Sequence, residues 1–223
     1  MPSPSVELRS VSKTYKDSAQ EAEVLHRVSL SIYPGTVTAL LGRSGCGKTT
    51  LLNLAGAMDF PTAGEVRIGG RATSSLNDAE LTALRRSQIG FVFQSFQLLP
   101  TLTVLENVEL PLLLARAPRS AETARERLRW VDLEAKVASF PYQLSGGQMQ
   151  RVAIARALAH SPEIIIADEP TGNLDTASGG QILNLLRRSA DELGAAVIMA
   201  THSAEAAAIA DVRVKMRDGR IEE

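Results

Sequence analysis

The segment Gly42-Arg43-Ser44-Gly45-Cys46-Gly47-Lys48-Thr49, which directly follows the apolar run Val37 to Leu41, decides the fold. The branched apolar run predicts a buried strand, and the glycines after it let the backbone turn tightly around an anion because they lack Cβ atoms. A predicted helix from Lys48 to about Gly56 follows, and its N-terminus favours negative charge. Strand, glycine-rich turn and helix together predict a nucleoside triphosphate site.

The end of this turn supplies the side-chain chemistry. Lys48 offers a positive charge to the phosphates, and the Thr49 hydroxyl is a ligand type that suits Mg²⁺. We interpret Cys46 as a small space-filling residue, and a reactive thiol is the alternative. The residues expected to bind the phosphates are Gly42, Arg43, Ser44, Gly45, Cys46, Gly47, Lys48, Thr49 and Thr50.

A second segment, Glu163-Ile164-Ile165-Ile166-Ala167-Asp168-Glu169, is an apolar run that ends in two carboxylates. It predicts a central parallel strand that delivers both acids to the edge of the sheet where ligands bind. Asp168 is placed to hold the Mg²⁺ that Thr49 also contacts, and Glu169 to reach the attacking water. The alternative is that the two acids only cap the strand, but the phosphate-binding turn elsewhere in the chain favours the metal and water roles.

With these residues in view, the chain resembles an ATP-binding cassette (ABC) ATPase subunit over essentially its whole length. The matches, in chain order, are the adenine-stacking aromatic (Tyr15), the Walker A loop (Gly42 to Thr49), the Q-loop glutamine (Gln94), the signature (Leu144 to Gln148), the Walker B strand with its catalytic glutamate (Ile164 to Glu169), the D-loop (Asn173 to Asp175) and the switch histidine (His202). The resemblance implies an α/β fold: a P-loop NTPase (RecA-like) core with an antiparallel β lobe and an inserted helical subdomain.

The resemblance also implies roles for the single residues. Glu169 would orient or deprotonate the water, and His202 would contact the γ-phosphate. Gln94 would lie between Mg²⁺ and the helical lobe and report on the γ-phosphate. Tyr15 would stack on adenine, although simple packing of a half-buried strand residue would also explain it. The implied ligands are ATP and Mg²⁺.

A site shared between two copies is a further implication. Ser145 and the glycines after it open a predicted helix, whose N-terminus favours an anion. In a head-to-tail dimer it would face the γ-phosphate held by Lys48 of the other copy, whereas the alternative is a helix cap packed in the core. The residues expected to contact nucleotide across the dimer are Ser145, Gly146, Gly147, Gln148 and Asp175.

Two longer stretches narrow the resemblance within the family. Phe93 to Val108 and Pro170 to Asp175 are similar to the lipoprotein-release and macrolide-export ATPases, a style that cell-division and peptide-antibiotic-resistance ATPases share. Such ATPases work with integral-membrane permease subunits, and they either power transport or transmit a conformational signal. Cys46 and the stretch Ala55 to Asp59 depart modestly from the commonest wording of this branch.

Composition agrees with one globular unit. The 223 residues are 44% hydrophobic and carry 24 Lys and Arg against 25 Asp and Glu, a formal charge of −1, so no strong field for nucleic acid is evident and no nucleic-acid partner is expected. The single cysteine cannot form an internal disulfide. The sequence shows no secretory signal and no apolar run of membrane-spanning length. Together with this observation, the resemblance implies a peripheral protein held at the cytoplasmic face of a membrane by its partner.

Pattern and turn signals divide the chain into expected elements and lobes. We expect a single ABC ATPase domain over 1–223, with 1–94 and 157–223 forming the nucleotide-binding core and 95–156 the helical signature subdomain. The expected strands are 6–15, 24–33, 37–41, 65–68, 89–93, 164–167, 196–200 and 212–216, with a hairpin over 215–222. The expected helices are 48–56, 102–115, 121–137, 177–193 and 203–210, with prolines at 111 and 118 bending or ending the second.

Overall fold

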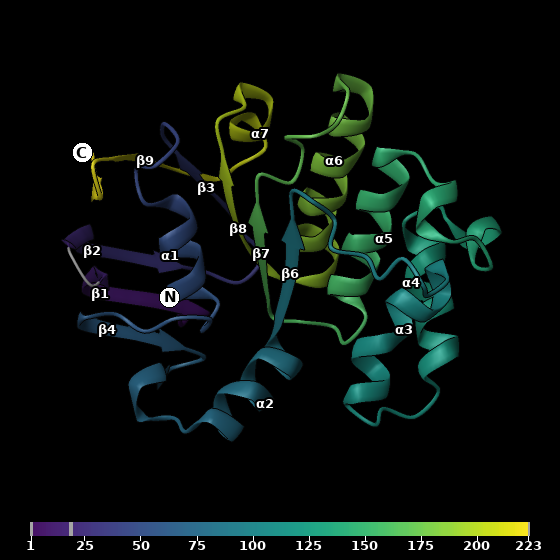
Figure 1. The fold of residues 1–223 in the computed structure, drawn as a ribbon, viewed down its shortest axis with the longest axis horizontal. Coiled ribbons are helices and arrows are strands. Elements are labelled where there is room, and N and C mark those ends of the chain that lie inside the picture. The colour runs from purple at the N-terminus through teal and green to yellow at the C-terminus, as the bar shows by residue number, and fades with distance from the viewer. Residues whose placement is uncertain (1, 18–19, 223) are drawn as a thin grey trace.

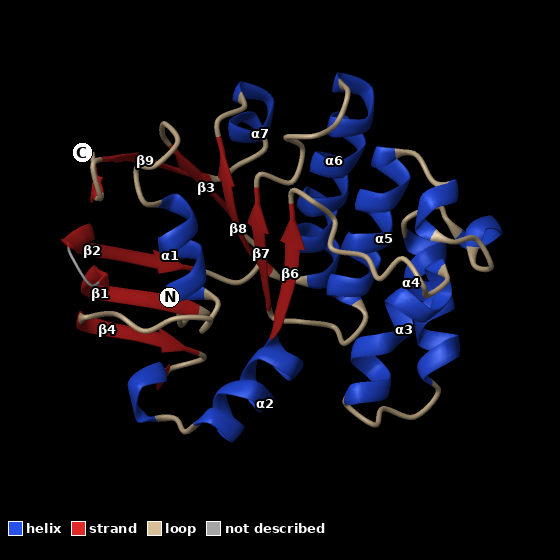
Figure 2. Ribbon diagram, viewed as in Figure 1, coloured by secondary structure: helices blue, strands red, loops and turns tan. Residues whose placement is uncertain are grey.

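The computed structural model describes residues 2–17 and 20–222. Figure 1 shows an antiparallel sheet on one side, the parallel strands in the middle and the larger helices on the other side. Figure 2 shows the same arrangement by secondary structure. The predicted fold class, an α/β core with an antiparallel lobe and a group of inserted helices, is confirmed.

The antiparallel sheet has the strand order β2-β1-β4-β5. Its strands are β1 (Val6–Asp17), β2 (Gln20–Ile32), β4 (Ala63–Ile68) and β5 (Arg71–Ala72). Apolar side chains such as Leu8, Leu25 and Val66 are buried on one face of this sheet. Buried and exposed residues alternate along the strands of a sheet that has one face on the core and the other face exposed to solvent.

The second sheet has the order β10-β9-β3-β8-β7-β6, and its strands from β9 to β6 are parallel. Its strands are β3 (Val37–Leu41), β6 (Ile89–Phe93), β7 (Ile164–Asp168), β8 (Ala196–Thr201), β9 (Val212–Arg217) and β10 (Arg220–Ile221). The predicted hairpin is confirmed, because β10 returns antiparallel to β9 through Asp218 and Gly219. The buried strands read as continuous apolar runs because both faces of the sheet are covered.

Helix α1 (Lys48–Ala55) is packed between the two sheets, with β7 and β8 on one side and β1, β2 and β4 on the other. Leu51 and Leu54 are fully buried there. This close apolar packing on both sides fixes the axis of α1 and therefore the direction of its N-terminus.

The opposite face of the parallel sheet is covered by helices. Helices α5 (Gly146–Leu158) and α6 (Thr176–Leu193) pack on this face, and α3 (Val104–Leu114) and α4 (Ser120–Trp130) pack against α5, while α2 (Asp78–Gln88) precedes β6 and α7 (Ala204–Ala208) precedes β9. Short 3₁₀ turns occur at Thr73–Ser75, Glu134–Lys136 and Pro141–Gln143. Within the described residues, no helix combines the length and apolar character needed to cross a bilayer.

Trp130, the last residue of α4, links this helical group to α6. Its Nε1 donates a hydrogen bond to Glu192 (3.1 Å), and the Arg188 guanidinium lies 4.5 Å from its ring centroid. Arg188 also pairs with Glu192 (2.9 Å). A cation above an indole face is a favourable arrangement.

Three predicted helices have different ends in the structure. The helix predicted over 121–137 ends at Trp130, because the chain turns at Asp132 with φ of +58° before the next 3₁₀ turn. The helix predicted over 102–115 continues through Pro111, which the prediction had bending or ending it, as far as Leu114. The helix predicted over 203–210 is shorter, with Ser203 as its N-cap.

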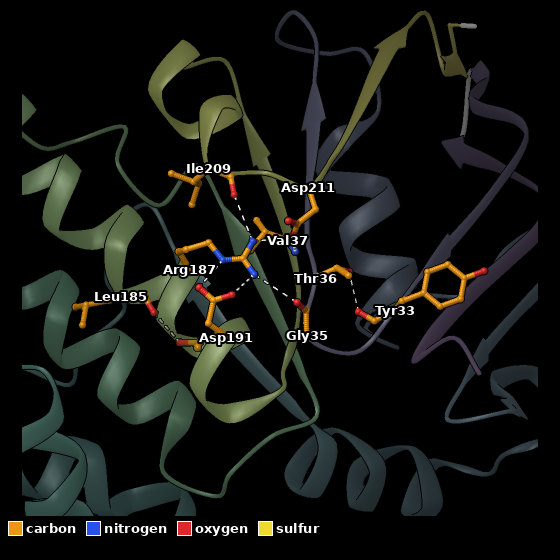
Figure 3. A network of polar contacts seen from close by, with 10 residues as sticks. Tyr33, Gly35, Thr36, Val37, Leu185, Arg187, Asp191, Ile209 and Asp211 are labelled. Atoms are coloured by element: carbon orange, nitrogen blue, oxygen red, sulfur yellow. Dashed lines mark hydrogen bonds and ion pairs between the residues drawn. The ribbon is translucent and has the colours of Figure 1, made fainter. Parts of the chain in front are cut away.

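An ion-pair network holds the beginning of β3 (Figure 3). The Asp211 carboxylate accepts hydrogen bonds from the Val37 backbone N–H (2.8 Å) and from Arg187 (2.6 Å). Arg187 also donates to the Gly35 carbonyl (3.3 Å) and to Asp191 (2.6 Å). The network thereby joins α6, the start of β3 and the segment that enters β9.

Candidate nucleotide-binding site

Four neighbouring strands of the parallel sheet, β3, β8, β7 and β6, end at one edge. This order places the glycine-rich turn, His202, the two acids of β7 and Gln94 side by side, as expected for the carboxyl edge of such a sheet. A cavity of about 680 Å³ lies there, lined by Val24, Ser44, Gly45, Gly47, Lys48, Thr49, Thr50, Gln94, Asp168, Glu169 and His202.

The glycine-rich turn wraps the N-terminus of α1. Gly45 and Gly47 have φ of +80° and +103°, and a Cβ on Gly47 would lie 2.9 Å from Leu25 Cδ2. The first backbone N–H groups of α1 have no partner inside the helix, so they are available to an anion. Lys48 is only 8% exposed, and its Nζ donates to the carbonyls of Gly42 (2.7 Å) and Arg43 (3.1 Å). Its charge is thus held beside the free N–H groups.

The structure brings Thr49 and Asp168 together. Thr49 Oγ1 donates to Asp168 Oδ2 at 3.0 Å. Burial raises the pKa of Asp168 above its ordinary value, and the nearby Glu169 adds to this, while the Thr49 hydrogen bond and Lys48 oppose it. A half-buried carboxylate whose negative charge is disfavoured is stabilised by a cation.

Glu169 and His202 form a second pair. His202 Nδ1 lies 3.0 Å from Glu169 Oε2; the glutamate side chain is 20% exposed and the histidine side chain 72%. Glu169 adopts a left-handed φ of +46°, and its N–H donates to the Ala200 carbonyl (3.0 Å). Such a backbone conformation in a non-glycine residue is found where the surroundings enforce it, often at active sites.

Gln94 is fixed from the loop after β7. Its Nε2 donates to Asn173 Oδ1 (3.1 Å), and Asn173 Nδ2 donates back to the Gln94 carbonyl (3.1 Å). A Cβ on Gly172 would lie 2.7 Å from Gln94 Nε2, so the glycine leaves the room that Gln94 occupies. The fully buried Gln150 of α5 donates to the carbonyls of Phe93 (3.2 Å) and Pro170 (2.8 Å). Helix α5 is therefore tied to both loops of the site.

The residues of the predicted signature lie apart from this cavity. Ser145 caps α5 by accepting from the Gln148 N–H (3.3 Å), and Gln148 Oε1 accepts from the Ser145 N–H (3.0 Å). Gly146 packs near Leu174, and a Cβ on Gly147 would lie 2.8 Å from Ser178 Oγ. None of these four described residues lines the cavity beside Lys48.

Asp175 belongs to a neighbouring cavity of about 330 Å³, which Glu169 and His202 also line. Its carboxylate caps α6 by accepting from the Ser178 N–H (2.9 Å) and hydroxyl (2.7 Å). The backbone bond from Ser178 is the larger cause that lowers the pKa of Asp175, followed by the hydroxyl bond.

Several predicted nucleotide contacts lie outside the main cavity. Gly42, Arg43 and Cys46 line a separate cavity of about 700 Å³ on the other side of the turn. Tyr15 pairs with Ala22 of β2, is 42% exposed, and donates its hydroxyl to Asp59 (2.9 Å). The prediction missed Val24, which reaches the main cavity from β2; no local pattern marks it.

Comparison with known proteins shows which family the chain belongs to. The family model described as ABC transporter matches residues 25–172. The chain belongs to the ABC transporter family. Among relatives of this ABC protein, an uncharacterized ABC transporter ATP-binding protein of Methanocaldococcus jannaschii is 47% identical over 97% of this chain and 95% of its own length.

Two named relatives agree with the resemblance to the lipoprotein-release and macrolide-export branch. The lipoprotein-releasing system ATP-binding protein LolD of Nitrobacter hamburgensis is 44% identical over 99% of this chain and 96% of its own length. The macrolide export ATP-binding/permease protein MacB of Rhodopirellula baltica is 45% identical over 98% of this chain, which spans 32% of that longer protein.

A solved structure matches the ABC fold closely. A dimeric post-hydrolysis state of an ATP-binding cassette bound to ADP and Pi has a TM-score of 0.90 with this chain at 45% identity, covering 98% of this chain and 97% of the other. The fold predicted from the sequence is thus one that a solved nucleotide-bound cassette also adopts.

Proposed function

We propose that this chain is the ATP-binding and ATP-hydrolysing subunit of an ABC transporter. The observation that carries the proposal is the convergence in one cavity of Lys48, the Thr49–Asp168 pair, the Glu169–His202 pair and Gln94. Residues of these types bind the phosphates, hold Mg²⁺ or position the attacking water in enzymes that hydrolyse nucleoside triphosphates. Relatives named as ATP-binding proteins support the assignment.

Mg²⁺ fits the residues present. Thr49 and Asp168 offer hard oxygen ligands 3.0 Å apart, the raised pKa of Asp168 reflects a carboxylate that a cation would stabilise, and Gln94 lines the same cavity. These three residues would hold the ion. Bound Mg²⁺ would neutralise charge on the β- and γ-phosphates.

The remaining steps belong to the chain itself. Lys48 leaves its contacts with the turn carbonyls to bind the phosphates, which the N-terminus of α1 also stabilises. Glu169 accepts a proton from the attacking water, and His202, held by Glu169, contacts the γ-phosphate. Tyr15, which is 42% exposed, stacks on the adenine. The phosphates would lie in the cavity beside Lys48, which is also lined by Ser44, Gly45, Gly47 and Thr50.

The second half of the site comes from another copy of this chain. Ser145 at the start of α5 is exposed, Gly146, Gly147 and Gln148 are partly buried, and none of the four lines the cavity beside Lys48, so this helix N-terminus would face a neighbour's γ-phosphate. Asp175 lies between Glu169 and the start of α6 and would carry the signal across the dimer. A dimeric relative supports this arrangement.

A groove fits an integral-membrane permease partner. This cavity of about 710 Å³ lies between α2, β6 and α3, and apolar Phe91, Leu110 and Leu114 line it together with Arg86 and Arg156. We assign it to a cytoplasmic helix of the permease with an apolar face and an acidic residue for the arginines. The ATPase would then sit peripherally at the cytoplasmic face of the membrane, with residues 95–156 moving as a helical subdomain against the core formed by 1–94 and 157–223.

The substrate class follows the relatives: a lipoprotein, lipid, peptide or drug that the permease extracts or exports. The second candidate is an ATPase that drives transmembrane signalling or transmits force without moving a substrate. Copurification with an integral-membrane protein is expected in both cases. Release of a substrate from membranes by the complex separates them.

The composite site is tested by mixing two inactive variants, Ser145→Arg and Lys48→Ala. A mixed dimer keeps one complete site, built from Lys48 of the first variant and Ser145 of the second. We expect the mixture to hydrolyse ATP faster than either variant alone, and wild-type specific activity to rise with protein concentration. An inactive mixture together with concentration-independent wild-type activity would show a site contained in one copy.

A further inference from the structure

The β9–β10 hairpin packs against the back of the phosphate-binding turn. The Gly219 N–H donates to the Cys46 carbonyl (3.1 Å), and the Gly219 carbonyl accepts from the His26 N–H (2.9 Å). One residue of the hairpin therefore joins the phosphate-binding turn to β2.

The bond to Cys46 has a consequence for the cavity in front of the turn. The carbonyl of Cys46 and the N–H of Gly47 belong to one peptide unit, which is planar and trans, so the two groups point in opposite directions. With the carbonyl fixed behind the turn by Gly219, the Gly47 N–H is directed forward. Gly47 lines the cavity that also contains Lys48.

Close packing removes the room for the turn to move backward. A Cβ on Gly42 would lie 2.4 Å from the Met216 carbonyl oxygen, and one on Gly47 would lie 3.6 Å from Met216 Cε. Cys46 itself is 7% exposed. A dense interior of this kind transmits a shift of the hairpin to the turn rather than absorbing it.

The hairpin turn needs glycine at this position. Asp218 and Gly219 have φ of +46° and +74°, as in the two-residue turns that join twisted antiparallel strands. A Cβ on Gly219 would lie 2.3 Å from the Val24 carbonyl oxygen and 2.7 Å from His26 Cδ2. Any larger residue must displace the turn from β2 and lengthen the bond to Cys46.

We propose that Gly219 is a positioning residue for ATP binding, which holds the Cys46–Gly47 peptide with its N–H toward the phosphates. The inference rests on the proposed function, because it assumes that the turn binds ATP. Met216 supports the same turn through its backbone and side chain. Neither residue lines the cavity beside Lys48 among the residues that the structure describes, so their effect on ATP is indirect.

The test compares Gly219→Ala with Gly70→Ala. Gly70 occupies the equivalent second position of the two-residue turn between β4 and β5, with φ of +77°, and its Cβ would meet open space in the described part of the chain. Both variants strain a left-handed glycine, but only Gly219 contacts the phosphate-binding turn. The measurements are the Kd for ATP by direct titration, kcat at saturating ATP, and the Tm.

For Gly219→Ala we expect the Kd for ATP to rise about tenfold, as for loss of one hydrogen bond to a charged group, with kcat changed less than about twofold. Gly70→Ala should lower the Tm but keep the wild-type Kd. A merely structural role would reduce the amount of binding protein and leave the Kd of the folded fraction unchanged. An unchanged Kd in Gly219→Ala, or an equal rise in Gly70→Ala, overturns the inference.

A second pair decides the matter if Gly219→Ala does not fold. Met216→Ala should raise the Kd for ATP about threefold, while Val214→Ala, which truncates a buried residue of the same strand away from the turn, should not. Equal values in the two variants overturn the inference. Wild-type protein that fails to bind ATP would instead refute the proposed function, so the two failures are distinguishable.

Discussion

Replacing Asp211 by Ala removes the acceptor that holds the first residue of β3. Val37 is fully buried, so its N–H would be left without a partner, at a cost of about 1 to 3 kcal/mol. The pair with Arg187 adds less, about 0.5 to 1 kcal/mol, because the Asp211 side chain is 47% exposed. The expected loss of unfolding free energy is therefore about 1.5 to 4 kcal/mol.

For a chain of this size, such a loss corresponds to a fall in Tm of about 3 to 16 °C, measurable by differential scanning calorimetry. The Kd for ATP should stay at the wild-type value, because Val37 lies at the end of β3 opposite the glycine-rich turn. Glu21→Ala, which breaks an exposed pair with Lys16, is the control and should shift the Tm by less than about 2 °C. A Tm for Asp211→Ala within about 1 °C of wild type would refute the reasoning.

The same residue gives a pH dependence with a definite sign. The backbone N–H of Val37, and then Arg187, lower the pKa of Asp211 below its ordinary value of 3.8. A carboxyl group whose pKa is lower in the folded state stabilises the protein above the ordinary pKa, and this contribution is lost as the pH falls through the folded value. The stability difference between wild type and Asp211→Asn should therefore be constant near neutral pH and shrink below about pH 4.

Three further predictions concern the site and its support. Glu169→Gln should slow ATP turnover by about 10²- to 10⁴-fold in single-turnover assays and leave the Kd for ATP largely intact, because the amide keeps the size but cannot accept the proton; wild-type turnover would remove Glu169 from that role. Lys48→Ala should weaken ATP binding in a direct titration, and an unchanged Kd would mean that the phosphates bind elsewhere. Gln150→Ala should lower the unfolding free energy in urea by about 1 to 3 kcal/mol, because the buried Pro170 carbonyl loses its donor while the Phe93 carbonyl keeps the Phe96 N–H; a loss under about 0.5 kcal/mol would contradict this.

The parts of the fold that could be predicted are those whose pattern lies in one continuous stretch of sequence. The strand and turn from Val37 to Thr49 and the acidic end of β7 combine local patterns with one chemical task, so both elements lie where they were expected. The end of α4 could not be predicted, because apolar residues continue at Val131 and Leu133 after the helix stops. Both are buried by the turn that follows rather than by a further helical turn.

Contacts between segments that are distant in the chain could not be predicted from the sequence. Asp211 caps the N–H of Val37 across 174 positions of the chain, and nothing near either residue indicates the other. The contact of Gly219 with Cys46 depends on β9 being the neighbour of β3, a strand order that periodicity does not contain. Roles that rest on a second copy, such as that of Ser145, stay predictions, because one chain shows only half of the arrangement.

The indole of Trp130, which contacts Arg188 and Glu192, provides an intrinsic fluorescence probe in this protein. Trp130 is the sole tryptophan, so all indole emission comes from the joint between α4 and α6. Its excited state responds to the charges near its ring, so a movement of α4 relative to α6 changes the wavelength or the intensity of its emission. Nucleotide-driven rearrangement is thus open to stopped-flow fluorescence on the unmodified chain.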